Sequence, residues 1–158
     1  MKFKRVAFGG TFDIPLHKGH KKLIKKAFDV GDFCLIGLTS DKFVKKLLKE
    51  YAEFIPKYRI RYENIVNYLN ERYKGRYKIV KLDKFYTEDL MKPNKIQALV
   101  VSEETYKGAK MINDLRKEKK LKPLKIIKIK MVLAEDGKPI SSTRIRKGEI
   151  DSEGRILK

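Results

Sequence analysis

Cysteine is nearly absent from this sequence, and its scarcity excludes disulfide-stabilised classes of protein. Cys34 is the single cysteine among 158 residues, so no disulfide can form within the chain, which fits a reducing cytoplasm. It lies in the apolar stretch FCLIGL, where a buried structural thiol is expected and a nucleophile is not. The sequence also has no apolar run of membrane-spanning length and no apolar signal-peptide segment ahead of its first glycines. We therefore expect a cytoplasmic protein without membrane contact.

Acidic residues are scarce relative to basic ones, with 20 Asp and Glu against 39 Lys and Arg and a formal net charge of +19. Glutamine is scarcer still, since Gln97 is the only one. Few Gln and many Lys are typical of heat-adapted surfaces, but such surfaces usually gain Glu as well, so heat adaptation leaves the imbalance unexplained. Two other interpretations are a nucleic-acid partner and a basic cleft that attracts small polyphosphates.

The apolar patterns along the chain predict alternating strands and helices in one domain spanning residues 1–158. Five strands are expected, at Val6–Phe8, Phe33–Ser40, Tyr77–Leu82, Ala98–Val101 and Ile126–Leu133. Helices are expected from Lys18 to the stop at Gly31 and over Asp41–Leu48, Tyr58–Tyr73, Glu103–Lys119 and Ser141–Lys147. This alternation indicates an α/β fold with a doubly wound, five-stranded parallel sheet and helices on both faces. Its ligand site is expected outside the carboxyl ends of the strands, where the strand order reverses.

Both histidines of the chain lie in one stretch, FGGTFDIPLHKGHKKLI, directly after the first predicted strand. Gly9 and Gly10 allow a sharp turn and close approach by a ligand, and the Thr11 hydroxyl can donate to a phosphate oxygen. His17 and His20 are three residues apart at a helix start, so they share a face near the positive end of the helix dipole. A polyphosphate fits this arrangement. The alternatives are a surface helix with incidental histidines and a metal pair, although no third metal ligand is apparent.

Two further stretches also follow predicted strands. In TSDKFVKK, after the second strand, Lys42 and Lys46 stand where a phosphate-binding lysine would be needed, but for either one alone a solvated amphipathic helix is the better explanation. In VVSEETYKG, after the fourth strand, Ser102 can cap the next helix, with acidic residues in its first turn. Capping explains neither Tyr106 nor Gly108.

A second anion-binding pattern, ISSTRIR, follows the fifth strand and its loop. Ser141, Ser142 and Thr143 offer three hydroxyls at a helix start, and Arg144 and Arg146 come after them. An N-cap on a basic surface helix is the simpler interpretation. Two separate phosphate-type patterns in one small domain, each following a strand, favour a polyphosphate site between them.

These stretches resemble the signatures of a known group of enzymes. GTFDIPLHKGH is similar to the H-x-G-H signature of the nucleotidyltransferase superfamily, and ISSTRIR is similar to its second signature, I-S-S-T-x-x-R. The block SEETYKG resembles the archaeal type of phosphopantetheine adenylyltransferase, a type also found in the bifunctional coenzyme A synthase of animals. The resemblance covers roughly residues 4 to 147. It implies the Rossmann-like fold of that superfamily.

The resemblance implies adenylyl transfer from ATP to 4'-phosphopantetheine, giving dephospho-coenzyme A and pyrophosphate, with Mg²⁺ bound through the ATP phosphates. It implies catalytic roles for His20, His17 and Lys42, and we expect His20 to donate to the α-phosphate and not to act as a base. The implied ATP site consists of Gly9, Gly10, Thr11, His17, His20, Ser102, Glu103, Tyr106, Ser141, Ser142, Thr143 and Arg146. The implied acceptor site consists of Thr11, Arg61 and either Lys42 or Lys46. One departure is His17, which stands where many bacterial relatives have Thr.

The residue types of the chain suffice for such a transfer, because the attacking group is the phosphate of the acceptor and no serine or cysteine nucleophile is needed. Alignment and stabilisation of the departing pyrophosphate remain for the protein to supply. The alternatives are a riboflavin phosphate, nicotinamide mononucleotide or phospho-alcohol acceptor, and a basic nucleic-acid-binding module. Nucleic acid is not expected, because the motifs cluster at strand ends and the aromatic platform of single-strand binders is lacking. We expect a monomer, in contrast to the larger assemblies of bacterial-type relatives.

Overall fold

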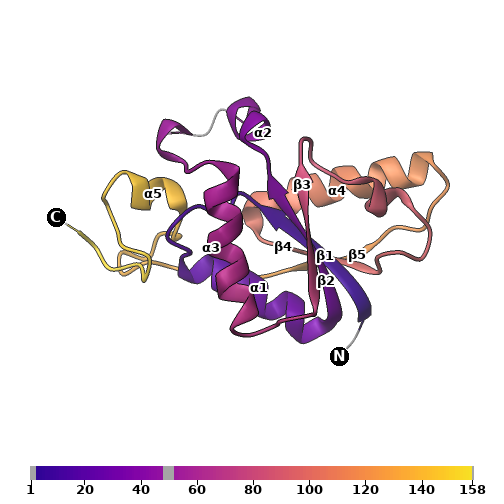
Figure 1. The fold of residues 1–158 in the computed structure, drawn as a ribbon, viewed down its shortest axis with the longest axis horizontal. Coiled ribbons are helices and arrows are strands. Elements are labelled where there is room, and N and C mark those ends of the chain that lie inside the picture. Colours follow the sequence, from indigo (N-terminus) through magenta and orange to yellow (C-terminus); the bar gives the residue numbers. More distant parts are fainter. Residues whose placement is uncertain (1–2, 48–51, 158) are drawn as a thin grey trace.

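The computed structural model of the chain, described for residues 3–47 and 52–157, contains a five-stranded parallel sheet (Figure 1). Its strands are β1 (Phe3–Gly10), β2 (Gly31–Thr39), β3 (Tyr77–Leu82), β4 (Ala98–Val101) and β5 (Lys125–Lys128). The helices are α1 (Lys18–Val30), α2 (Asp41–Lys46), α3 (Tyr58–Asn70), α4 (Glu103–Glu118) and α5 (Ser142–Arg146). Two short 3₁₀ turns are η1 (Ala52–Phe54) and η2 (Glu88–Met91).

The strands lie in the order β3-β2-β1-β4-β5, and every pairing is parallel. From β1 the chain winds outward through β2 to β3 and then returns to the other side of β1 to add β4 and β5. The direction of winding therefore reverses between β1 and β4, which is the switch point where doubly wound sheets bind ligands. The predicted fold class is confirmed.

Two apolar cores cover the two faces of the sheet. Successive residues of a strand point to opposite faces, so in β1 Val6 and Phe8 contact the core under α1 and α3, whereas Ala7 contacts the core under α4 and η2. Cys34 in β2 belongs to the first core and is fully buried. Burial raises the pKa of its thiol to about 12, so the prediction of a structural cysteine is confirmed.

Helix boundaries agree with the sequence patterns to within one residue, except at two ends. Helix α1 begins at Lys18 and ends just before Gly31, as predicted. Helix α3 ends at Asn70 and not at Tyr73, because the chain turns directly after it. Helix α2 ends at Lys46, and Leu48, its predicted last residue, lies outside the described residues. Among the residues that the structure describes, no helix has both the length and the apolar character needed to cross a membrane.

The fifth strand is shorter than the alternation of Ile129, Met131 and Leu133 predicts. Its ladder with β4 ends where β4 ends, and the Ile129 N–H makes a last hydrogen bond of 2.9 Å to the Val101 carbonyl. Met131 and Leu133 are 50% and 56% exposed. The strand predicted over Ile126–Leu133 is therefore wrong at these two residues, because β4 ends at Val101 and offers the chain beyond Ile129 no backbone to pair with.

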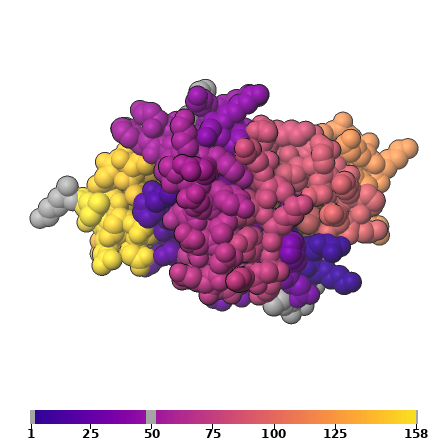
Figure 2. Space-filling model, viewed as in Figure 1, coloured from indigo at the N-terminus to yellow at the C-terminus, as the bar shows by residue number. Residues whose placement is uncertain are grey.

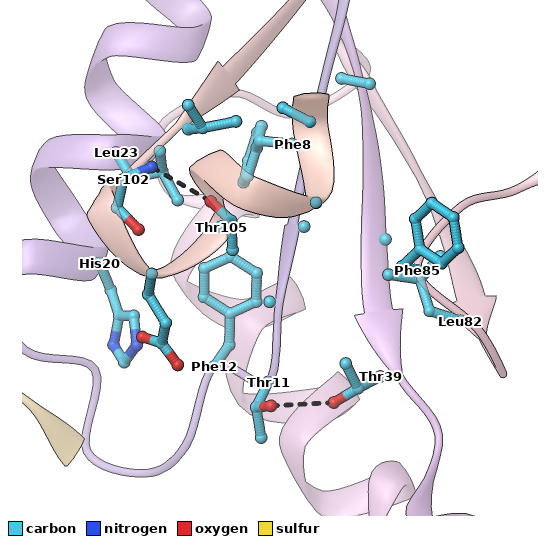
Figure 3. A pocket seen from close by; sticks show the side chains of 18 of the residues that line it. Phe8, Thr11, Phe12, His20, Leu23, Thr39, Leu82, Phe85, Ser102 and Thr105 are labelled. Carbon is cyan, nitrogen blue, oxygen red and sulfur yellow. Dashed lines mark hydrogen bonds between the residues drawn. The ribbon is translucent and has the colours of Figure 1, made fainter. Parts of the chain in front are cut away.

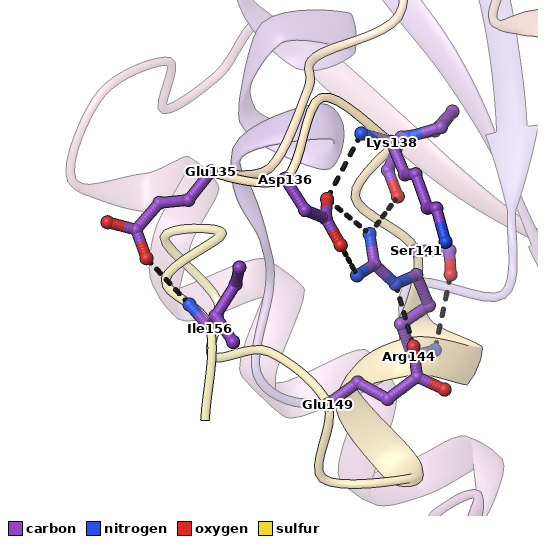
Figure 4. A network of polar contacts seen from close by, with 8 residues as sticks. Glu135, Asp136, Lys138, Ser141, Arg144, Glu149 and Ile156 are labelled. Carbon is purple, nitrogen blue, oxygen red and sulfur yellow. Dashed lines mark hydrogen bonds and ion pairs between the residues drawn. The ribbon is translucent and has the colours of Figure 1, made fainter. Parts of the chain in front are cut away.

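Residues 134–157, which we call the C-terminal segment, gather at one end of the molecule (yellow in Figure 2). A small apolar cluster holds the segment together, formed by Ala134, Ile140 and Ile150. Outside this cluster, Arg144 forms ion pairs with Asp136 and Glu149 and donates to the Pro139 carbonyl (Figure 4). Helix α5 therefore rests on a satellite core and not on the sheet.

Candidate active site

A cavity of about 550 Å³ opens at the carboxyl ends of the strands, at the switch point between β1 and β4 (Figure 3). The loop after β1, the first turn of α4 and the start of α5 supply its polar wall. Figure 3 shows His20 on one side of the cavity and Leu82 and Phe85 on the other. The cavity therefore has a polar end that suits phosphates and an apolar end that suits an uncharged group.

Phe12 holds the loop after β1 in an unusual conformation. Its φ of 49° lies in the left-handed region, which a bulky residue rarely adopts. Its side chain is buried, with 6.0 Å between the ring centroids of Phe12 and Phe8 and 5.3 Å between those of Phe12 and His20. These aromatic contacts stabilise the strained backbone. Four of the cavity-lining residues of this region form what we call the first cradle, namely Gly9, Gly10, Thr11 and His20.

His17 is the N-cap of α1 and not a residue of its first turn, which corrects the expected placement of both histidines on the helix. Its Nδ1 accepts hydrogen bonds from the N–H groups of Gly19 and His20, at 2.9 and 3.3 Å. The Nδ1 of His20 accepts from the His17 N–H at 3.2 Å, and the two rings stack with 3.7 Å between their centroids. With both Nδ1 atoms acting as acceptors, each neutral ring carries its hydrogen on Nε2.

The ring of His17 is packed closely behind His20 and does not line the cavity. A Cβ on Gly19 would lie 2.7 Å from the Cε1 atom of the His17 ring, so a glycine is required there. Burial lowers the pKa of His17 to about 4, while Glu104 and Asp13 act in the opposite direction. His17 is therefore neutral at pH 7 and keeps its cap. In this arrangement it positions His20, and its own contact with ATP stays a prediction.

The start of α5 forms the second cradle, whose cavity-lining residues are Ser141, Ser142, Thr143 and Arg146. Ser141 caps the helix, since its Oγ accepts from the Arg144 N–H at 3.2 Å. The Arg146 Nη2 donates to the Thr143 hydroxyl at 3.2 Å, while Nη1 forms an ion pair with Asp13. The side chains of this pair are only 8% and 5% exposed. The pair thus joins the second cradle to the loop that carries the first.

Asp13 also lines the cavity, although the sequence did not mark it as a site residue. Its Oδ1 accepts from the Ile14 N–H at 2.7 Å, and Oδ2 contacts Arg146. A carboxylate in a loop that binds phosphate would repel its ligand unless a cation neutralised it. That conflict of charge was the one signal in the sequence that Asp13 has a partner elsewhere.

Helix α4 brings Ser102, Glu104, Thr105 and Gly108 to the cavity. The Ser102 N–H donates to the Thr105 hydroxyl at 3.2 Å (Figure 3). Glu103 instead forms an ion pair with Lys128, whose Nζ lies 4.6 Å from the centroid of the Tyr106 ring. Neither Glu103 nor Tyr106 belongs to the cavity lining, so their contact with the nucleotide stays a prediction. The helical period turns positions 104, 105 and 108 to the cavity and positions 103 and 106 toward β5.

The lysines of α2 lie beside the cavity and not in its wall. Lys42 and Lys46 are exposed, and neither belongs to the lining. Phe43 belongs to it, and so does Leu47, which caps the carboxyl end of the helix. Helix α2 therefore borders the cavity with apolar side chains while its lysines stay in solvent. The choice between Lys42 and Lys46 as the acceptor's partner stays a prediction.

Arg61 is fully buried and lies outside the cavity lining. Its Nε donates to the Pro56 carbonyl at 2.8 Å, and its Nη1 donates to the Thr11 carbonyl at 3.0 Å. Nη1 also lies 3.4 Å from the Thr39 hydroxyl, and Nη2 contacts Asp41 at 3.2 Å. The guanidinium thus lies behind the first cradle, which corrects its implied position facing an acceptor.

The apolar end of the cavity had no signal in the sequence as a binding site. It is formed by residues of β2, β3, η2 and α4 and their flanks, including Leu35, Val80, Phe85, Leu90 and Ile112. Residues that line an apolar pocket have the same periodicity as residues that pack against each other, so sequence patterns assign both to the core.

The described residues were compared with the requirements of a metal centre. Within residues 3–47 and 52–157 no group of three His, Cys, Asp or Glu could hold a metal ion. Each of the two histidines also uses its Nδ1 to accept from backbone N–H groups.

A parallel sheet wound in this order, with two anion cradles meeting at its switch point, defines an α/β nucleotide-binding domain. The model of the cytidylyltransferase-like family matches residues 7–148, which include both cradles. A phosphopantetheine adenylyltransferase from Pyrococcus abyssi is 46% identical over 160 residues, covering 100% of this chain and 98% of its own. The enzyme of the same name from Pyrococcus horikoshii is also 46% identical and covers 99% of this chain and 97% of its own.

Among solved structures, a protein of unknown function from Archaeoglobus fulgidus is 38% identical with a TM-score of 0.68. The match covers 82% of this chain and 89% of that one. The chain therefore belongs to the cytidylyltransferase-like family and, within it, to the phosphopantetheine adenylyltransferases of archaea.

Proposed function

We propose that this protein transfers the adenylyl group of MgATP to 4'-phosphopantetheine, forming dephospho-coenzyme A and releasing pyrophosphate. The observation that carries the proposal is one cavity with two anion cradles at its polar end and room for a long uncharged arm at its apolar end. Archaeal relatives that carry this activity in their names, at 42% to 46% identity over nearly the whole chain, support the choice of acceptor.

In this reaction an oxygen of the acceptor's phosphate attacks the α-phosphorus of ATP. A new P–O bond forms while the bond from the α-phosphorus to the oxygen that bridges it to the β-phosphate breaks, and pyrophosphate leaves with the electron pair. No proton has to move, because a phosphate monoester is largely ionised at pH 7. The protein has to hold the reacting groups in line and stabilise the charge that develops on pyrophosphate.

The first cradle would act on the α-phosphate. His17 fixes the ring of His20 through the Nδ1 contact, so the Nε2–H of His20 is the donor available to a phosphate oxygen. The second cradle would hold the β- and γ-phosphates with the hydroxyls of Ser142 and Thr143 and the guanidinium of Arg146. Asp13 would keep Arg146 oriented toward the cavity.

The acceptor would lie between the first cradle and α2. Its phosphate would contact the Thr11 hydroxyl and a lysine of α2, Lys42 or Lys46, and its arm would occupy the apolar end of the cavity. Mg²⁺ would arrive bound to the ATP phosphates and would add to the neutralisation of their charge.

A pyrophosphate-release assay tests the proposal. Purified protein is given MgATP or MgCTP together with 4'-phosphopantetheine, riboflavin phosphate, nicotinamide mononucleotide or glycerol phosphate. We expect release with ATP and 4'-phosphopantetheine, and dephospho-coenzyme A in the product mixture by mass spectrometry. His20→Ala protein, purified in the same way, controls for contaminating enzymes. Release with CTP and glycerol phosphate, and none with 4'-phosphopantetheine, would contradict the proposal.

A further inference from the structure

Arg61, in the first turns of α3, is the largest of the fully buried side chains in the described residues. Burial of a guanidinium is costly unless acceptors match its donors. Burial lowers the pKa of Arg61, and hydrogen bonding to Asp41 opposes this. Arg61 is nevertheless 0% exposed, so the hydrogen bonds that it makes are the feature to explain, since an apolar side chain could not make them.

Arg61 makes hydrogen bonds to three segments that border the cavity: the loop after β1, the end of β2 and the start of α2. Nη1 donates to the Thr11 carbonyl at the end of β1, and the same nitrogen lies beside the Thr39 hydroxyl at the end of β2. Nη2 contacts Asp41, the first residue of α2, whose Oδ1 also accepts from the Tyr58 N–H at 2.8 Å. Arg61 therefore fixes the separation between the first cradle and α2.

The Thr11 hydroxyl is the group most directly affected. The Thr39 hydroxyl donates to it at 3.1 Å (Figure 3), and both threonines line the cavity. Arg61 contacts the carbonyl of one threonine and the hydroxyl of the other. Arg61 therefore helps to orient the Thr11 hydroxyl, although the Arg61 side chain does not itself line the cavity.

Arg76 provides an internal comparison. It also makes several hydrogen bonds, donating to the carbonyls of Phe28, Gly31 and Asp32 at 3.0 Å each. These partners lie at the end of α1 and the amino end of β2, outside the cavity lining, and Arg76 contributes nothing to that lining. Contact with several carbonyls is therefore not what distinguishes Arg61. What distinguishes it is that two of its partners line the cavity.

We propose that Arg61 is a positioning residue for the acceptor phosphate. By holding Thr11, Thr39 and Asp41 in place it sets the distance between the Thr11 hydroxyl and the lysines of α2, and it does not touch the acceptor. Thr11 belongs to the first cradle, but none of the four partners of Arg61 belongs to the second cradle, which would hold the β- and γ-phosphates. We therefore expect ATP binding to be less affected than binding of the acceptor. The inference rests on the proposed function, which supplies the identity of the acceptor.

The experiment compares steady-state kinetics of Arg61→Lys with those of the matched control Arg76→Lys. Lysine keeps the charge of Arg61 but cannot bridge its partners. We expect the KM for 4'-phosphopantetheine to rise by about tenfold or more and the KM for ATP to change by less than about twofold. Arg76→Lys should leave both KM values within about twofold of wild type, even if its melting temperature falls.

A second variant, Thr39→Val, keeps the experiment decisive if Arg61→Lys does not fold. It removes the hydroxyl between Arg61 and Thr11 at almost constant volume and should raise only the KM for the acceptor. Equal rises in both KM values, or an unchanged acceptor KM in a folded variant, would overturn the inference.

Lack of wild-type turnover with 4'-phosphopantetheine would contradict the proposed function instead. In that case the effect of Arg61→Lys on the two KM values is measured with whichever phosphorylated acceptor the wild type does use. If the wild type turns over none of the acceptors of the pyrophosphate-release assay, both the proposed function and this inference are contradicted.

Discussion

The two cradles face one cavity but rest on different supports. The first is built at the end of β1, the central strand of the sheet, and Phe12 anchors it in the main core. The second is built on a helix of five residues, supported by the satellite cluster and by the ion pairs of Arg144. One buried ion pair, between Asp13 and Arg146, joins the two.

This difference predicts different stabilities for the two halves of the site. Segments with few buried apolar contacts open at a lower free energy than the whole domain. The first cradle should therefore open only when the sheet unfolds, whereas the C-terminal segment can detach locally. The site would be rigid where the bond to the α-phosphorus breaks and adjustable where pyrophosphate departs.

The largest effect is expected from His20→Ala, which removes a donor from the rigid cradle. We expect kcat to fall by about two to three orders of magnitude, the usual result of losing one donor to a transition-state oxyanion. Stability should fall by only about 1 kcal/mol, because the lost Nδ1 contact is part of a helix cap. Steady-state kinetics and thermal melts measure both. Near-normal kcat in the folded variant would show that His20 does not donate to the reacting phosphate.

Arg146→Met breaks the connection between the cradles. We expect the KM for ATP to rise by about a hundredfold, because a buried charged donor to the phosphates is lost. The free energy of unfolding should fall by about 3 kcal/mol, since the Asp13 carboxylate stays buried without this cation.

The double variant Arg146→Met with Asp13→Asn separates these two effects. It should recover most of the stability, because the buried charge is gone, while the KM for ATP stays high. Urea titrations and initial-rate kinetics give both values. Recovery of stability and KM together would assign Arg146 a structural role only.

The third effect is a dependence of stability on pH through His17. Its pKa is about 4 in the folded protein against an ordinary value of 6.5. Between these values the unfolded chain binds a proton that the folded chain does not, so the free energy of unfolding falls as the pH drops from 6.5 toward 4. The total loss from this group is about 3 kcal/mol and is complete below pH 4.

His17→Asn checks this, because asparagine keeps an acceptor at the N-cap but does not titrate. Urea unfolding of wild type and variant is compared at intervals between pH 4 and pH 7. The variant should show a flatter profile across the window that His17 governs. Parallel profiles would mean that His17 is not the group responsible.

The smallest effect is expected from Asp136→Asn, the counterpart of the Arg146 variant. This variant breaks the ion pair between Asp136 and Arg144. Arg144 precedes Arg146 by two residues in α5 but does not line the cavity. We expect kinetics and global stability close to those of wild type, with faster hydrogen exchange of the α5 amides and unchanged exchange in β1. Faster exchange in both elements would contradict the idea of separate supports.

The sheet could be predicted because its signal is local. Phe33–Ser40 is almost continuously apolar, and the structure buries it on both faces. The end of β5 could not be predicted in the same way. Ile129, Met131 and Leu133 alternate as a strand does, but pairing depends on the length of β4, which the alternation does not contain.

The residue types of the site were also visible in the sequence, because a glycine pair, the histidines and the hydroxyl–arginine run each follow a strand. Their arrangement was not visible. Glu104 faces the cavity and Glu103 does not, which depends on how α4 is rotated on the sheet. Asp13 and Arg146 are 133 residues apart and meet only after the C-terminal segment has docked. Such contacts are set by tertiary packing and not by spacing.

The central claim is that both cradles hold one triphosphate chain. The most direct test is calorimetric titration of ATP and AMP into wild type and Arg146→Met, without acceptor. We expect wild type to bind ATP at least about tenfold more tightly than AMP, and the variant to lose most of that difference while its affinity for AMP is kept. An unchanged ratio of ATP to AMP affinity in the variant would contradict the claim.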